Sequence, residues 1–181
     1  MNEGLIPRRY AKALYKVALD RKCDSRIYEL MQNLAAAYGV SETLRQLLAN
    51  PFVDGADKTA ALEAAAGASD SDTTFADFVK LLIENRRIDM AGGVAHAYVD
   101  LYRQEHNIRR VEVISAAPLD KAVEQRIKAV VEAHLHGASM EFSTKVDPDL
   151  IGGFIVSVDN ERLDASLRHS LKEIRLNLLN K

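Results

Sequence analysis

Apolar residues recur at the spacing of an α-helix through the first hundred residues of the chain. Short breaks that contain glycine, proline or helix-capping residues divide this stretch into six segments. The predicted helices cover residues 8–20, 27–38, 41–48, 58–66, 75–85 and 94–104. Six helices with short connections are typical of a compact helical bundle.

The ends of these helices are predicted from residues that have known preferences at helix termini. Pro7 stands where the first helix begins, Gly39 ends the second, and Ser41 caps the third. Gly67 closes the fourth helix. The pair Gly92-Gly93 is interpreted as a break that precedes the sixth.

Beyond residue 106 the apolar period shortens to two, which is typical of strands. Strands are predicted around residues 111–114, 140–143 and 154–158, with a helix over 120–135 and a last helix over 164–179. The order strand, helix, strand, strand, helix describes a small α/β domain. The chain is therefore predicted to be α+β overall, with a six-helix bundle over residues 1–105 and a small α/β domain over residues 106–181.

The first and fifth predicted helices have wider apolar faces than a surface helix needs. Apolar residues cover about 240° of the first helix and about 220° of the fifth, at roughly 100° a residue. A surface helix in a small bundle usually shows a stripe of about 100°. Something must cover the remaining apolar surface.

Two interpretations of these wide faces stay open on periodicity alone. The two helices can be central, with the other four enclosing them. Alternatively, an exposed apolar groove between them receives an amphipathic helix from another chain.

Composition narrows the function classes. Apolar residues make up 48% and charged residues 28%, which is ordinary for a globular protein. The 24 basic and 26 acidic residues give a net charge of -2, which argues against nucleic acid as the partner. We find no apolar run near the roughly 18 residues that a membrane span needs, and no secretory signal near the first residue. Cys23 is the single cysteine, so an intramolecular disulfide is excluded.

Several residue groups superficially suggest chemistry. His134 and His136 are two positions apart on a helix, so they point in different directions and make a poor metal pair. Gly152-Gly153 precedes a strand and lacks the dinucleotide-binding pattern, so a close backbone approach is the simpler interpretation. We therefore predict no metal and no cofactor.

An enzyme and an RNA-binding module are the alternatives considered. Asp164, Ser166 and His169 share one predicted helix start, and helix capping explains them better than a catalytic triad, whose members come from separate elements. A regulatory protein- or RNA-binding module remains the second hypothesis. Phe142 and Phe154 are the only aromatic residues of the predicted strands, and we expect each to pack beneath a helix.

Five segments resemble the δ subunits of F-type ATP synthases, the family of the mitochondrial oligomycin-sensitivity-conferring protein. They follow the family order across nearly the whole chain: residues 9–15, 84–88, 113–119, 146–156 and 164–168. The most specific match is the C-terminal signature, of which we single out Asp147, Gly152, Gly153, Asp164, Ser166 and Arg168. Ala165 and His169 depart from the family, which usually has glycine at both positions.

The resemblance implies a fold and a role. It implies a non-catalytic adaptor with an N-terminal bundle of six helices and a C-terminal α/β domain, present in one copy per complex. In the family the bundle binds N-terminal helices of the α subunits of the catalytic head, in a groove between its first and fifth helices. The C-terminal domain meets the C-terminal region of the b subunit. Direct membrane insertion and nucleic-acid binding are not implied.

The two helices that the family uses are those with the wide apolar faces. Our candidates for the groove are Tyr10, Ala13, Leu14, Val17, Phe78, Val79 and Leu82. The absence of a transit segment favours the cytoplasmic face of a bacterial inner membrane.

Overall fold

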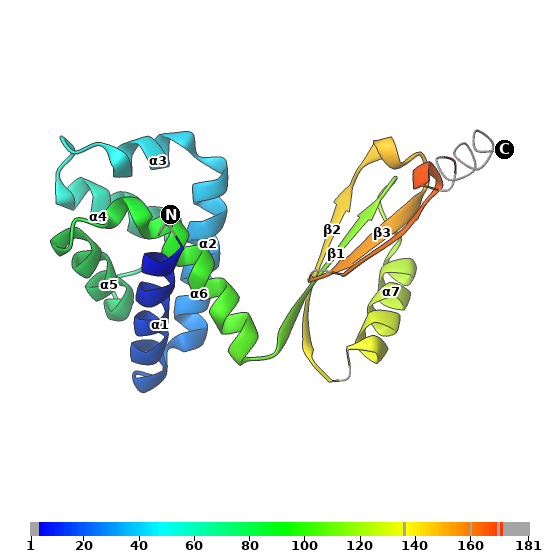
Figure 1. The fold of residues 1–181 in the computed structure, drawn as a ribbon, viewed down its shortest axis with the longest axis horizontal. Coiled ribbons are helices and arrows are strands. Elements are labelled where there is room, and N and C mark those ends of the chain that lie inside the picture. The colour runs from blue at the N-terminus through cyan, green and yellow to red at the C-terminus, as the bar shows by residue number, and fades with distance from the viewer. Residues whose placement is uncertain (1–3, 136, 160, 170, 172–181) are drawn as a thin grey trace. The chain divides into compact units, whose positions relative to one another are not determined.

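A computed structural model describes residues 4–135, 137–159, 161–169 and 171. The chain divides into two compact units, Met1–Gln104 and Glu105–Lys181 (Figure 1). The first consists of helices and the second contains a four-stranded sheet. The α+β class predicted from the sequence is confirmed.

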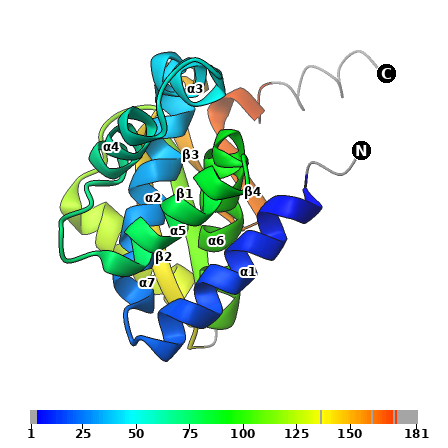
Figure 2. The same ribbon diagram turned by 90° about the vertical axis from the view of Figure 1, so that its left-hand side faces the viewer.

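The N-terminal unit is built from α-helices joined by short loops, with α1 along its outer edge (Figure 2). Its elements are α1 (Leu5–Asp20), α2 (Asp24–Val40), α3 (Glu42–Ala49), α4 (Gly55–Ala66), α5 (Thr73–Glu84), the 3-10 helix η1 (Ile88–Met90) and α6 (Ala91–Glu105). The helix η1 was not predicted.

Two of the predicted helix ends are confirmed by their geometry. The Ser41 hydroxyl accepts a hydrogen bond from the Leu44 amide at 3.2 Å, which satisfies a free donor at the start of α3. Gly67 follows α4 with φ of 70°, a left-handed conformation that glycine adopts without steric cost.

Two predicted glycine breaks are wrong. Gly39 lies inside α2, which continues to Val40, and Gly92 and Gly93 lie inside α6. Any side chain at position 92 would overlap the ring of Tyr38, so glycine there allows α6 to approach α2 closely. This glycine serves packing between helices and does not end one.

A cluster of tyrosines ties α1, α2 and α6 together. The rings of Tyr28 and Tyr102 stack with centroids 4.1 Å apart, and Tyr15 meets Tyr98 and Tyr102 edge to face. Tyr98 is fully buried and its hydroxyl donates to the Asp24 carbonyl at 3.4 Å. Burial raises the pKa of Tyr98 above its ordinary value, so this hydroxyl stays neutral.

The C-terminal unit contains a mixed sheet with the helix α7 packed on it (Figure 1). Its elements are β1 (Ile108–Ser115), α7 (Lys121–His134), β2 (Ser139–Val146), the 3-10 helix η2 (Pro148–Leu150), β3 (Gly153–Val158) and β4 (Glu161–Ser166). The strand order is β2-β1-β3-β4. Strands β1 and β2 are parallel and joined through α7, and the other pairs are antiparallel.

The core of this unit lies between α7 and the sheet. Val111, Val113 and Val156 from the strands meet Val131 of α7, and Phe142 and Phe154 pack against them. The expectation that these two phenylalanines pack beneath a helix is confirmed.

Strand β4 was missed by the sequence prediction, which placed residues 164–166 in the last helix. Residues 161–166 instead pair with β3, and helical structure begins at Leu167. The Ser166 hydroxyl accepts from the His169 amide at 3.2 Å, so Ser166 is the capping residue. The predicted continuation to residue 179 lies mostly outside the described residues, as does His136.

Candidate partner-binding groove

Helices α1 and α5 are antiparallel neighbours. At one end, Arg21, just after α1, donates to the Asp77 carboxylate at 2.9 Å and to the Thr74 hydroxyl at 3.1 Å, near the start of α5. At the other end, the first turns of α1 face the last turn of α5 across a shared cavity. The Arg21 contacts fix the register of the two helices.

The cavity has a volume of about 370 Å³ and is open to solvent. Four residues of α1, one of α5 and one from the loop after α5 line it: Ile6, Arg9, Tyr10, Ala13, Leu81 and Arg87. The α1 residues are spaced three or four positions apart, so they lie on one face of the helix. Val17 continues this face and is 41% exposed.

We call this surface the α1/α5 groove and define it by the six cavity residues and Val17. Leu81 is 43% exposed, so part of its side chain is open to solvent. Arg9 and Arg87 form no ion pair with another described residue. The groove therefore has an apolar floor with positive charge at one end.

The seven candidates from the sequence divide into two groups. Tyr10 and Ala13 line the cavity, and Val17 is exposed farther along α1. The other four are buried within the N-terminal unit: Leu14, Phe78, Val79 and Leu82. Because these four side chains fill the core, they are not accessible to a partner and do not form the groove surface.

The residues of the wide apolar face of α5 thus divide into a buried set and an exposed one. Phe78, Val79 and Leu82 point into the unit, and Leu81, at one edge of the same arc, points outward. Leu81 belongs to the predicted apolar arc but is not among the seven groove candidates. The helical period of apolar residues does not indicate which edge of the arc faces solvent. Ile6, Arg9 and Arg87 were also missed, although Arg9 and Arg87 belong to segments that carry the family resemblance.

The C-terminal signature residues meet at the junction of β3, β4 and the following helix. Gly153 pairs with Ser166 in the ladder, and the Leu167 amide donates to the Gly152 carbonyl at 3.0 Å. Gly153 has φ of 78°, and a side chain there would overlap the Ala165 carbonyl. The close backbone approach predicted for the glycine pair is confirmed.

Ser166 and Asp164 complete this junction. The Asp164 carboxylate accepts from the Ser166 hydroxyl at 2.6 Å and from its amide at 3.1 Å. These hydrogen bonds lower the pKa of Asp164. Asp147 has a similar local role, since it accepts from the Asp149 amide at 3.0 Å. Arg168 follows in the helix and is exposed. The hydrogen bonds of Asp147, Asp164 and Ser166 and the close approach at Gly153 give these residues local structural roles.

No group of histidine, cysteine and acidic residues among the described residues has the arrangement of a metal site. His134 ends α7, and its predicted pair His136 lies outside the described residues. In the part of the chain that the structure describes, we find no helix with the length and apolar character for a membrane span.

Comparison with known proteins decides the family. The family model for the ATP synthase delta (OSCP) subunit matches residues 6–178. The chain belongs to this family. The ATP synthase subunit delta of Parabacteroides distasonis is 36% identical over 179 residues, which cover 99% of this chain and 98% of that protein. The corresponding subunit of Synechococcus elongatus is 36% identical over 169 residues, or 93% of each chain.

The fold agrees with that of a chain in a solved structure. A chain in the cryo-EM structure of the Toxoplasma gondii mitochondrial ATP synthase hexamer superposes with a TM-score of 0.70, 22% identity and coverage of 96% of this chain and 97% of that one. The family predicted from the resemblance is confirmed, and with it the role of a non-catalytic, peripheral-stalk subunit of ATP synthase.

Proposed function

We propose that this δ-family chain links the catalytic head to the peripheral stalk through two separate surfaces. The α1/α5 groove receives an N-terminal helix of an α subunit, and the C-terminal unit binds the C-terminal region of the b subunit. Torque from the rotor acts on the head during ATP synthesis, so the adaptor has to hold the head still. One copy serves each complex.

The observation that carries this proposal is the exposed Leu81 opposite the Ile6–Val17 face of α1. An amphipathic helix can place its apolar stripe on this floor, as in other helix-in-groove complexes. Arg9 and Arg87 favour a partner with acidic residues near the end of the helix that lies beside them. Apolar contact then supplies most of the affinity, and the two arginines set the orientation.

A second surface supports binding to the stalk. A cavity of about 580 Å³ lies between α7 and the β3–β4 side of the sheet. Val130 is 71% exposed and Leu163 is 65% exposed beside it. No described side chain covers these two residues, and an apolar helix end from the b subunit would bury them.

We place the protein at the cytoplasmic face of a bacterial inner membrane, as a peripheral part of the complex. The two delta subunits named above come from bacteria. A regulatory protein- or RNA-binding role has no support among the matched proteins.

The substitution Leu81→Asp tests the groove. Because Leu81 is exposed, the variant should fold normally, and a charge on the groove floor should weaken binding to the isolated head about tenfold or more. Ala76→Asp is the matched control, since Ala76 is exposed on the same helix and does not line the cavity. Binding can be measured by surface plasmon resonance with immobilised head.

Equal affinity of Leu81→Asp and Ala76→Asp for the head would overturn the groove assignment. The stalk surface is tested in parallel with Leu163→Asp, for which we expect weaker binding to the b-subunit fragment and unchanged binding to the head. Val146→Asp is the control, because Val146 is exposed on β2 and lies outside the cavity lining.

A further inference from the structure

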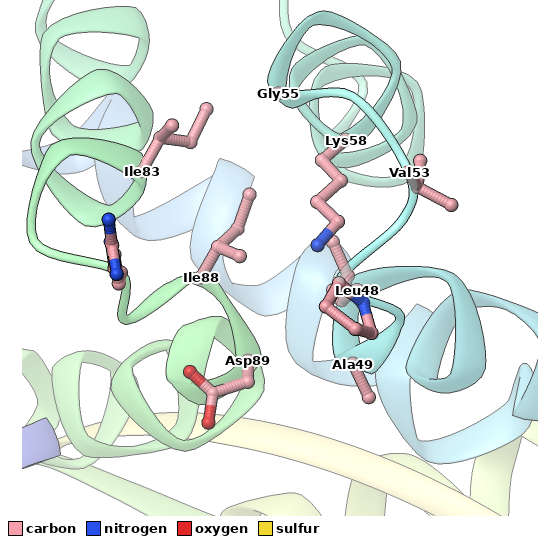
Figure 3. A pocket seen from close by; sticks show the side chains of 10 residues that line it. Leu48, Ala49, Val53, Gly55, Lys58, Ile83, Ile88 and Asp89 are labelled. Atoms are coloured by element: carbon pink, nitrogen blue, oxygen red, sulfur yellow. The ribbon is translucent and has the colours of Figure 1, made fainter.

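A second cavity in the N-terminal unit lies between the end of α3, the start of α4 and the segment that joins α5 to η1. Its volume is about 440 Å³, within the usual range of small-ligand sites. Leu48, Val53, Ile83 and Ile88 provide apolar walls (Figure 3). It shares no lining residue with the α1/α5 groove.

Lys58 is the unusual residue of this cavity. Lys58 is 8% exposed as a residue, and Figure 3 shows its side chain extending from α4 so that its amino group points into the space bounded by Leu48 and Ile88. Within the described residues, the amino group has neither a hydrogen-bond partner nor an ion-pair partner. Since lysine is rarely buried without a partner, the position needs an explanation.

The stability of α4 does not explain why a lysine stands at position 58. The residue lies near the amino end of α4, where the helix dipole disfavours positive charge. Its carbon chain packs against apolar neighbours, as lysine stems often do, but the charged group then normally reaches open solvent. Here the amino group points into the cavity that Lys58 lines (Figure 3). A ligand that enters the cavity therefore meets this charge.

The other charged residues of the cavity indicate the charge of the ligand that it can bind. Arg86 lines it as a second cation without an ion-pair partner among the described residues, and Asp89 is its one acidic residue. The net charge of the lining is thus positive by one. The apolar walls favour carbon over water, and Asp89 disfavours an anion with two charges.

We infer that this cavity binds a carboxylate carried on a short apolar chain, with the carboxylate on Lys58 and the chain against Ile83 and Ile88. A charge-assisted hydrogen bond from an ammonium that is partly enclosed by apolar walls is stronger than one in open solvent. A free short-chain acid and a glutamate side chain of a neighbouring protein share this chemistry. The inference does not depend on the proposed adaptor function.

The test is a titration of the full-length protein, labelled with ¹³C in its isoleucine methyl groups, with sodium hexanoate. We expect saturable shifts of the Ile83 and Ile88 methyl signals. Lys58→Met keeps the apolar stem and removes the charge, so it should weaken hexanoate binding about tenfold or more. Lys58→Arg should retain binding. Lys80→Met, on the exposed face of α5, is the matched control and should bind as the unaltered protein does.

The inference would be overturned by the absence of a saturable shift, by equal binding of hexan-1-ol, or by equal binding of hexanoate to Lys58→Met. Inorganic phosphate that binds as tightly as hexanoate would also overturn it, because the apolar walls would then have no role. If Lys58→Met does not fold, Arg86→Met replaces it, since Arg86 is exposed, and several-fold weaker binding is expected. A parallel titration with N-acetylglutamate methylamide distinguishes the two sources of the carboxylate. Tighter binding of hexanoate indicates a free short-chain acid, and tighter binding of the glutamate compound indicates a glutamate side chain of a neighbouring protein.

Discussion

The two units of the chain bury their apolar residues to different extents. In the N-terminal unit, Phe75, Leu82 and Tyr98 are fully buried, and the main uncovered apolar surface of α5 is the edge at Leu81. In the C-terminal unit, α7 contributes one buried residue, Val131, while Val130 on the same helix is 71% exposed. The first unit buries most of its large apolar residues and leaves an exposed apolar edge along α1 and α5. In the second unit, among the described residues, part of the apolar surface beside α7 is exposed.

This difference predicts how binding of a partner should affect the stability of each unit. A helix in the α1/α5 groove adds contacts to a unit that is already well packed, so it should bind without changing the fold. A partner in the cavity beside α7 covers surface that would otherwise belong to a core, so its binding should also stabilise the C-terminal unit.

The largest expected effect is a difference in the free energy of unfolding between variants at two adjacent leucines of α5. Leu82→Ala should lower the free energy of unfolding of the N-terminal unit by about 2–5 kcal/mol, because it opens a cavity in a packed core. Leu81→Ala should change it by about 0.5 kcal/mol or less, since Leu81 is exposed. Urea unfolding followed by circular dichroism measures both. Similar losses for the two variants would contradict the division of the α5 face.

The next effect concerns the β3–β4 junction. Gly153→Ala should destabilise the C-terminal unit by about 1–3 kcal/mol, because the left-handed backbone is strained for alanine. The overlap with the Ala165 carbonyl adds to this cost. Gly137→Ala is a useful control, since Gly137 also has positive φ but has open space around it. An equal effect at both glycines would show that close approach of β4 is unimportant.

A smaller effect concerns the ion pair that fixes the start of α5. Arg26 of α2 donates to the Asp72 carboxylate at 3.0 Å and lowers the pKa of Asp72 from 3.8 to about 2. A lowered pKa means that the folded state favours the ionised carboxylate. This stabilisation is complete above the ordinary pKa and is lost as pH falls through about 2.

Asp72→Asn should therefore lower the free energy of unfolding at neutral pH by about 1–2 kcal/mol. The difference from the unaltered protein should shrink as pH falls below about 4. Urea midpoints measured at several pH values test this. A difference that stays constant between neutral pH and pH of about 2 would show that the charge of Asp72 is not the cause.

The sequence predicts well what local interactions decide. Ser41 begins α3 and Gly67 ends α4 through contacts within a few residues, and both were predicted. Gly92 carries the same local signal but lies inside α6, because its close packing against Tyr38 of α2 overrides the signal. Gly39 lies inside α2, one residue before the helix ends at Val40. Strand β4 contains mostly polar residues, so its pairing with β3 cannot be read from its period.

The groove illustrates the same limit. The width of the two apolar faces predicts that α1 and α5 carry more apolar surface than one side of a helix needs. It does not say which residues of the arc face solvent, and so Leu82 was selected where Leu81 is the exposed one. That distinction depends on the positions of the other helices, which are long-range contacts.

Hydrogen–deuterium exchange of the full-length protein with and without the isolated head tests the central claim most directly. The account predicts slower exchange on head binding in α1 and α5, around the groove, and unchanged exchange in the C-terminal unit. Protection confined to the C-terminal unit, or to α3 and α4, would contradict it.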